Sequence, residues 1–352
     1  MCVPMYPNCN ERILLYIWID FEYMAILISL FPVFFFLVFL FLLDSFKLVI
    51  KKYLALAVIW GTLSAITAYF LHTFLVENIG VRFEILSRYI APATEEILKA
   101  LFIFFMIYKK RVGFMIDAAI YGFAAGAGFA LIEGSLLLNT YENSDMLFWL
   151  IRGLGTSIMH GGCTALLSAL LLGSISRKRL TPGNIAIALL IAYAIHSLFN
   201  HFSIDPLIQT ASIIIVLPVL LVSIFKYNEN QLQHWLEIEF NSEVELLAMI
   251  NKGKILSTRS GEYLASLKSR FSGETILDMY CFISLYLELS IIAKRNVMLK
   301  ECGFPVIIEK GTEAKLRELH LLRKNIGKVG ELTLAPLIRL KYRDLWKLNT
   351  LK

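Results

Sequence analysis

The stretch YIAPATEEILKALFIFFMIY, residues 89–108, decides the fold class of this chain. It is long and apolar enough to cross the hydrocarbon core of a bilayer, which takes about 20 residues of α-helix. Two adjacent carboxylates, Glu95 and Glu96, and one ammonium, Lys99, interrupt it. A charged side chain at the bilayer centre costs about 2.5–3.5 kcal/mol on insertion scales, so such residues face the interior of a helix bundle and mark a functional site.

The whole chain has the composition of a membrane protein. Of its 352 residues, 57% are hydrophobic and 18% are charged, against about 45–50% and 25% in soluble domains. The mean hydropathy is +0.66. We therefore predict an all-α protein in which a polytopic membrane helix bundle, 23–226, follows an extracytoplasmic segment, 1–22, and precedes a cytoplasmic soluble helical domain, 227–352. The net charge of +6 follows from membrane topology and needs no nucleic-acid partner.

Basic residues alternate between the ends of about seven predicted spans. They follow the first span (Lys47), the third (Lys109), the fifth (Arg177) and the seventh (Lys226), whereas the other loops are nearly free of them. The positive-inside rule then predicts a multi-pass plasma-membrane protein with its N-terminus outside and its C-terminal domain in the cytoplasm. The predicted spans are 23–43, 53–76, 88–108, 114–139, 147–174, 183–202 and 208–226.

Small residues indicate which spans lie at the centre of the bundle. The fourth span contains YGFAAGAGFALIEG, residues 121–134, and the fifth contains RGLGTS, 152–157, and HGG, 160–162. Glycine and alanine let helix backbones approach closely in a membrane. We expect these two spans to be the most buried.

Further polar residues occur in the spans after the glutamates. Glu133 lies in the fourth span, His160 in the fifth, and His196 and Asn200 in the sixth. Counted at about 1.5 Å per residue from the predicted outer ends, all of them and the glutamates fall between the outer surface and the midplane. Four helices therefore place carboxylates and imidazoles at a common depth.

Helical spacing suggests how the first group is arranged. Lys99 follows Glu95 by four residues and Glu96 by three, so it can pair with either carboxylate and leave the other free. Pro92 is predicted in the first turn of its helix, which would place both glutamates near the positive end of the helix dipole.

Carboxylates and imidazoles in a partly dry pocket suit acid–base activation of water, and a neutral histidine or an asparagine can donate a hydrogen bond to an oxyanion. Two histidines and a glutamate can also hold zinc with an open position. The set is thus compatible with peptide-bond hydrolysis, with or without a metal. Purely structural roles stay open for each residue, among them an ion pair between Glu95 and Lys99 or a helix–helix hydrogen bond at His160.

Other intramembrane protease signatures are missing from the sequence. There is no HExxH zinc motif and no GxGD aspartyl motif, and GTSI around Ser157 is not the GxSG of a serine protease.

Four short motifs resemble those of the PrsW-type intramembrane proteases, which belong to a wider group that includes the CAAX prenyl endopeptidases. They are EEILK at 95–99, FALIE at 129–133, the single His160, and HSLFN at 196–200, in order on four successive spans. Glu133 stands where the prenyl endopeptidases carry histidine, which argues against a prenylated substrate.

The resemblance implies a metalloprotease-like peptidase of the plasma membrane. Carried over, Glu95 or Glu96 activates water, His160 and His196 bind a metal such as zinc or stabilise the oxyanion, Glu133 is a ligand or orients one, and Asn200 assists as a donor. The expected substrate is a membrane-tethered protein in the lipid bilayer, for instance an anti-sigma-type regulator. The soluble tail is outside the motifs, and its partner is unknown.

Two other functions are compatible with the same residues. A non-enzymatic membrane scaffold or sensor would signal through residues 227–352. A proton-coupled transporter would use the carboxylates as proton carriers, although the chain shows no internal repeat of the kind common in transporters.

Overall fold

In the computed structural model, all regular elements of the described residues are helices, with no strand among them. The described residues are 34–38, 41–42, 49–138, 151–177, 180–201, 203–255, 259–306, 309, 311–338, 348 and 351. The predicted segment 1–22 and most of the first predicted span, 23–43, lie outside them. The elements are α2 (Lys51–Glu77), α3 (Phe83–Ile85), η1 (Leu86–Ile90), α4 (Ala91–Tyr108), α5 (Met115–Leu138), η2 (Ile151–Gly155), α7 (Thr156–Arg177), α8 (Pro182–His201), α9 (Pro206–Asn251), α10 (Arg259–Ser266), η4 (Leu267–Ser269), α11 (Gly273–Glu301) and α12 (Thr312–Leu334).

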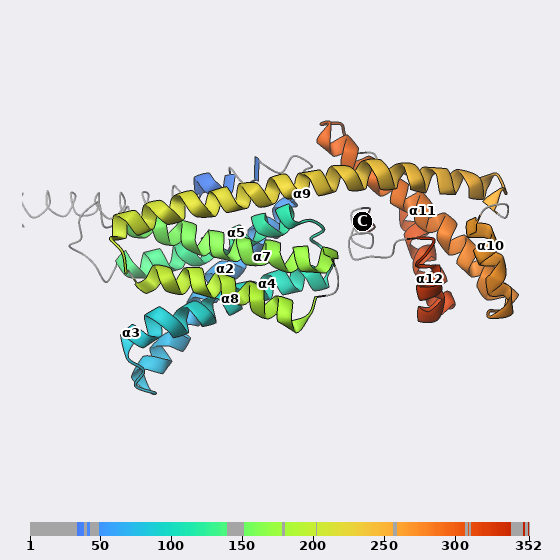
Figure 1. Ribbon diagram of the computed structural model, residues 1–352. Coiled ribbons are helices and arrows are strands. Elements are labelled where there is room, and N and C mark those ends of the chain that lie inside the picture. The colour runs from blue at the N-terminus through green and yellow to red at the C-terminus, as the bar shows by residue number, and fades with distance from the viewer. Residues whose placement is uncertain are drawn as a thin grey trace, which may run out of the picture.

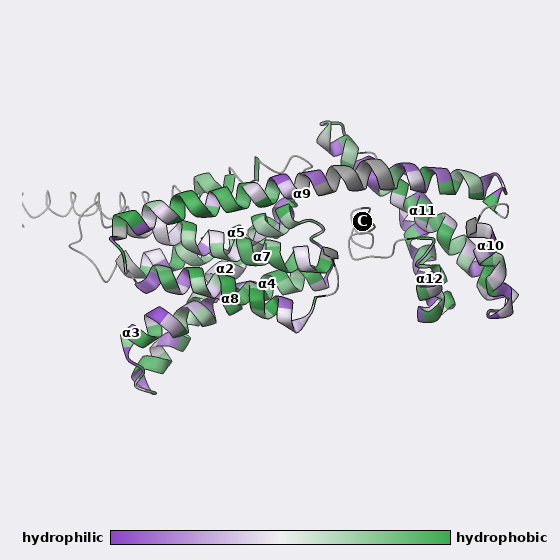
Figure 2. Ribbon diagram, in the orientation of Figure 1, coloured by the Kyte–Doolittle hydropathy of each residue, from purple (hydrophilic) through white to green (hydrophobic). Residues whose placement is uncertain are grey.

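The first part of the structure is a bundle of α2, α4, α5, α7, α8 and the first half of α9, which run side by side in Figure 1. Apolar residues dominate these helices in Figure 2. Five of them, α2, α5, α7, α8 and the start of α9, are long and apolar enough to cross a membrane. They confirm five of the predicted spans as helices of that kind. Helix α4 forms as well, but Glu95, Glu96 and Lys99 interrupt its apolar stretch.

Helices α5 and α7 form the centre of the bundle, as the small residues predict. Their apolar windows are 83% and 78% buried, against 28% in α2, 28% in α8 and 17% in α9. A Cβ atom on Gly126 of α5 would lie 2.3 Å from the carbonyl oxygen of His160 on α7, and one on Gly61 of α2 would lie 1.9 Å from the carbonyl oxygen of Ala125. Glycine therefore sets the distance between the helices that carry the polar residues.

A π-turn, η1, joins α3 to α4 without a break. The Ala91 N–H bonds to the carbonyl of Leu86, five residues back, instead of Ser87, and Pro92 has no N–H to offer the carbonyl of Arg88. Pro92 lies in the first turn of α4, as predicted. Because η1 runs into α4 without a break, however, this turn is not a free helix N-terminus beside the glutamates. The wider π-turn accommodates a proline that an α-turn would not.

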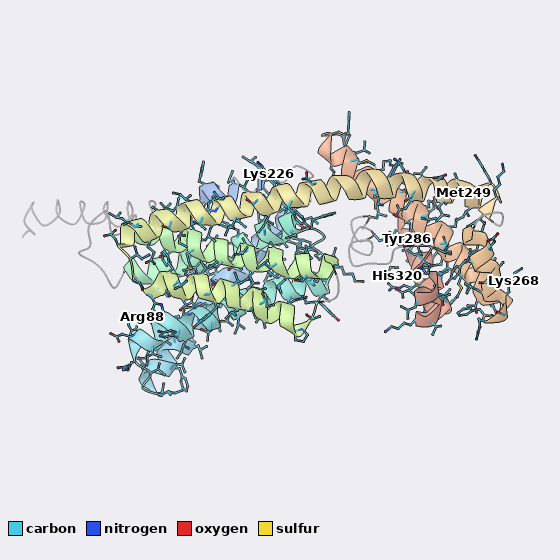
Figure 3. All side chains as sticks on the ribbon, in the orientation of Figure 1. Arg88, Lys226, Met249, Lys268, Tyr286 and His320 are labelled. Atoms are coloured by element: carbon cyan, nitrogen blue, oxygen red, sulfur yellow. The ribbon has the colours of Figure 1, made fainter. Side chains whose placement is uncertain are left out.

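The two carbonyls released in η1 attach α8 to this part of the chain. The Ser197 hydroxyl donates to the carbonyl of Arg88 at 2.6 Å. The Asn200 amide donates to the carbonyl of Ser87 at 3.0 Å. Backbone groups inside a bilayer must find partners within the protein, so η1 and α8 satisfy each other. Arg88 itself lies on the end of the bundle where α3 projects (Figure 3).

Helix α9 continues out of the bundle for a total of 46 residues. Its second half packs with α10, α11 and α12 around a second hydrophobic core, at the far end of the molecule from α3 (Figure 1). Segments QLQHWLEIEF and SEVELLAMI both belong to this one helix, because no glycine or proline lies between Lys226 and Asn251. Lys226 marks the middle of α9 in Figure 3.

Helix α11 also has the length and composition of a membrane span. Within it, Lys294 is completely buried and its Nζ lies 3.2 Å from Oε2 of Glu243 on α9. Ser290 donates to the same carboxylate at 2.5 Å. That α11 is a buried helix outside the membrane stays a prediction.

We expect Gly126→Ala to destabilise the bundle by about 1–3 kcal/mol, the usual cost of overpacking a close contact. The midpoint of thermal unfolding of the purified protein in detergent measures this. Gly134→Ala is the matched control in the same helix, because a Cβ there meets no atom of the described residues within 4 Å and alanine favours the helix. Equal midpoints for the two variants would contradict the close packing of α5 on α7.

Candidate active site

The polar residues of the bundle converge on α4. Glu95, Glu96 and Lys99 are all buried there, with 8%, 1% and 0% of their surface exposed. His160 of α7 and His196 of α8 lie at hydrogen-bond distance from this group, and Glu133 of α5 bonds to His160. Six of the seven candidate residues on these four helices thus form one connected cluster.

Glu96 is the most fully bonded member of the cluster. Its Oε1 accepts a hydrogen bond from the Lys99 ammonium at 2.5 Å and lies 2.9 Å from Nδ1 of His196. The Thr164 hydroxyl of α7 lies 3.4 Å from its Oε2. Of the two carboxylates that Lys99 can reach, the structure therefore pairs it with Glu96.

The surroundings of His160 fix which ring nitrogen carries the proton. Its Nδ1 lies 3.0 Å from the Lys99 Nζ. An ammonium has only donors, so Nδ1 accepts and the proton is on Nε2. That Nε2–H points to Oε2 of Glu133 at 2.5 Å, and Glu133 orients the ring from the cleft side.

His196 has the opposite arrangement. Its Nδ1 faces the Glu96 carboxylate, which only accepts, so Nδ1 carries the proton and Nε2 keeps its lone pair. Nε2 lies 3.7 Å from Oε2 of Glu95. The His196 and His160 rings stand edge to face, with centroids 4.7 Å apart.

Glu95 is the carboxylate left free. Its Oε2 is buried and has no hydrogen-bond partner among the described residues. A buried carboxylate oxygen without a partner is costly in a native structure and calls for an explanation such as a catalytic role or an ion. Glu95 is therefore the group in this cluster with capacity to bind something else.

A cavity of about 660 Å³ opens onto Glu95 from the α3 end of the bundle. Its walls come from α2, η1, α4, α5 and α8, and include Ala65, His72, Ser87, Glu95, Glu133 and Asn200. Phe83 on its rim is 71% exposed. The cavity, here named the cleft, is large enough for several residues of an extended peptide.

One residue of the cleft was missed in the sequence. His72 of α2 has Nδ1 4.0 Å from Oε1 of Glu95 and Nε2 2.8 Å from the Thr94 hydroxyl. An ionisable side chain inside an apolar span was the signal that could have found it. No recognised motif includes it, which is why it was passed over.

Asn200 lies on the cleft wall but donates to the Ser87 carbonyl. Its amide therefore secures α8, which carries His196 one turn earlier. It does not point its donor at Glu95 in this arrangement.

Three residues can hold a metal ion. Glu95, His160 and His196 each offer one ligand atom, and these atoms lie within 4.8 Å of one another. The motifs predicted the same two histidines but Glu133 as the carboxylate. Two imidazole nitrogens and one carboxylate oxygen fit zinc with an open position, and Glu96 behind Nδ1 of His196 is the usual outer partner of a histidine ligand.

A sequence profile of the PrsW family of intramembrane metalloproteases matches residues 50–225. That match covers half of the chain and all four site-bearing helices. The chain belongs to the PrsW family. It is thus a membrane-embedded peptidase, as the motifs predicted, and the scaffold and transporter alternatives lose their support. No curated protein and no solved structure matches the chain.

The two adjacent glutamates should respond differently to removal of charge. Glu96→Gln leaves the buried Lys99 ammonium without its ion pair, and breaking a buried pair costs about 3–5 kcal/mol. Glu95→Gln removes no hydrogen bond of Oε2 and should change stability by less than about 1 kcal/mol. Thermal and urea unfolding in detergent compare the two. A Glu95→Gln variant as unstable as Glu96→Gln would contradict the assignment.

Proposed function

We propose that this PrsW-family peptidase hydrolyses a peptide bond of a membrane-tethered protein near the outer face of the membrane, with Glu95 as the base. The observation that carries the proposal is the unbonded, buried Glu95 Oε2 at the floor of a cleft. The other members of the cluster are already engaged with one another. Residues of α3 and η1 line the cleft, and α3 lies at the end of the molecule opposite the C-terminal helices (Figure 1). This position supports a cut on the extracytoplasmic side.

In the proposed reaction, the oxygen of a water molecule forms a bond to the scissile carbonyl carbon. Glu95 takes one proton from this water and passes it to the leaving nitrogen as the C–N bond breaks. The other proton stays with the new carboxyl group. Glu96 and Lys99 do not react; they hold His196 and His160 in fixed and opposite tautomers.

Zinc is the proposed metal, held by His160, His196 and the Glu95 carboxylate, and it would supply a positive charge that polarises the scissile carbonyl. For His160 to act as a ligand, its Nε2 must give up the proton now directed at Glu133, and that carboxylate is in place to receive it. Without a metal, the Nε2–H of His160 would be the group that donates a hydrogen bond to the oxyanion.

Metal analysis of the purified protein tests this ligand set. We expect zinc close to one equivalent per chain, reduced at least about tenfold in His160→Ala and His196→Ala, because loss of a ligand weakens zinc binding strongly. Glu95→Gln should lose more zinc than Glu133→Gln, since Glu133 is bonded to His160 whereas the buried Glu95 Oε2 has no hydrogen-bond partner among the described residues. The reverse order would return the carboxylate ligand to Glu133. An active wild-type protein without metal would contradict the zinc proposal.

Cleavage itself is tested on proteoliposomes with fluorogenic single-span peptides. Each carries about 20 apolar residues and a donor–quencher pair that brackets its outer boundary. We expect Glu95→Gln to lower the cleavage rate about 10²–10⁴-fold, the usual contribution of a general base. His201→Asn, outside the cluster, serves as the control. Intact cleavage in Glu95→Gln and His160→Ala together would overturn the proposed mechanism.

We propose that the protein lies in the plasma membrane, with its N-terminus outside the cell and residues 227–352 in the cytoplasm. The support is the alternation of basic loops, including Lys109 after α4 and Arg177 at the end of α7. Labelling of single cysteines from either side of the membrane separates this orientation from its inverse. A membrane-tethered regulator of the anti-sigma type is the proposed natural substrate, and the C-terminal helices are proposed to bind a cytoplasmic partner.

A further inference from the structure

His72 lies on the buried face of α2. It follows the buried Ala65 and Ala68 at spacings of seven and four residues, so all three share a stripe of the helix. Only 15% of its side chain is exposed, and that part lines the cleft. An imidazole in a transmembrane helix needs polar partners, and both ring nitrogens of His72 face α4.

Thr94 determines the tautomer of His72. The Thr94 oxygen lies 3.0 Å from the carbonyl of Ile90 and 3.1 Å from that of Ala91, and 2.8 Å from Nε2 of His72. The hydroxyl has one hydrogen, which the two backbone carbonyls share. The oxygen therefore accepts from Nε2–H of His72, and Nδ1 is left with a lone pair.

That lone pair faces the Glu95 carboxylate. The distance of 4.0 Å from Nδ1 to Oε1 is too long for a hydrogen bond, and both atoms are acceptors. A polar gap of this length between two acceptors suits a bridging water, which donates one hydrogen to each. At hydrogen bonds of about 2.8 Å, such a water reaches both atoms.

We propose that His72 is a positioning residue of the peptidase site, which holds the attacking water against Oε1 of Glu95. This role presupposes the proposed peptidase function and adds to it the group that orients the nucleophile. A water that donates both hydrogens keeps its two lone pairs for the cleft, where the scissile carbonyl arrives. Glu95 removes one of these hydrogens, and the other stays on the water oxygen, hydrogen-bonded to Nδ1 of His72, until the product forms.

The two faces of Glu95 then have separate tasks. Oε2 lies 3.7 Å from Nε2 of His196, on the side of the metal-ligand cluster. Oε1 lies toward His72 and the cleft. Helix α2 carries no recognised motif, but through His72 it becomes the fifth helix that contributes a residue to the site.

Two amide variants separate the ring nitrogens of His72. An asparagine amide superposes on Nδ1, whereas a glutamine amide reaches the Nε2 position and the Thr94 hydroxyl. On the fluorogenic single-span peptides, we expect His72→Gln to lower kcat about 100-fold, the effect of a misplaced reactant, with KM within about twofold. His72→Asn should retain at least about a fifth of the wild-type kcat.

Thr94→Val tests the anchor, because valine keeps the shape and removes the hydroxyl. We expect a loss of kcat of about tenfold. Thr67→Val is the matched control, since Thr67 of α2 is exposed and, among the described residues, its hydroxyl bonds to the carbonyl of Leu63 in its own helix. Thermal unfolding of all variants confirms that they are folded.

Nitrogen-15 solid-state NMR of histidine-labelled protein in bilayers identifies the tautomer of His72 independently of any activity measurement. The signal lost in His72→Asn should be that of a ring protonated at Nε2. A ring protonated at Nδ1 overturns the proposal, because Nδ1 could then not accept from water.

The kinetic outcomes are equally decisive. Higher activity of His72→Asn than of His72→Gln supports the proposal. Equal activities, whether high or low, or the reverse order overturn it. If the His72 variants are active and Glu95→Gln is inactive, only the role of His72 is overturned. If the wild-type protein cleaves no faster than Glu95→Gln, the peptidase proposal itself is overturned.

Discussion

The ion pair between Lys99 and Glu96 is the interaction on which the bundle depends. Both groups are buried in a segment that would otherwise be apolar, so neither is tolerable without the other. Lys99 donates to one imidazole and Glu96 accepts from the other. A single pair on one helix therefore fixes α7 and α8 against α4 and gives His160 and His196 opposite tautomers. The site therefore presents the Nε2–H of His160 and the Nε2 lone pair of His196, and the charges of Lys99 and Glu96 determine both.

Adjacent glutamates thus perform different tasks because they point to different neighbours. Glu96 faces the centre of the bundle, where both of its oxygens contact fixed partners, whereas Glu95 faces the cleft. Family membership assigns peptidase chemistry to this arrangement, and the free oxygen indicates which carboxylate is available for it. The close approach of α5 and α7 through glycine brings Glu133 within reach of His160, so packing and chemistry are determined by the same contacts.

Much of this arrangement could be predicted from the sequence. Charged residues in apolar runs cannot face lipid, so Glu95, Glu96, Glu133, His160 and His196 had to turn inward, and their common depth brought them together. Glycine-rich spans likewise had to lie at the centre. The choice between Glu95 and Glu96 for Lys99 could not be predicted, because both spacings are helical and only the positions of α7 and α8 decide. The continuity of α9 past Lys226 and the π-turn before α4 also depend on packing partners, since the same residues would form ordinary helix ends elsewhere. His72 is likewise an ionisable residue inside an apolar span, which is the feature that identified the other site residues, but it belongs to no recognised motif.

The π-turn η1 has a consequence for the length of the chain. It contains one residue more than an α-helical turn, and this wider turn leaves the carbonyls of Ser87 and Arg88 to accept from Asn200 and Ser197. Removal of one residue between Phe83 and Ala91 would shorten η1 to the length of an α-turn. Pro92 would still offer no N–H to the turn before it, and the two carbonyls would no longer be held where α8 can reach them. In this short segment the number of residues is constrained as tightly as the chemical identity of the acidic pair that follows it.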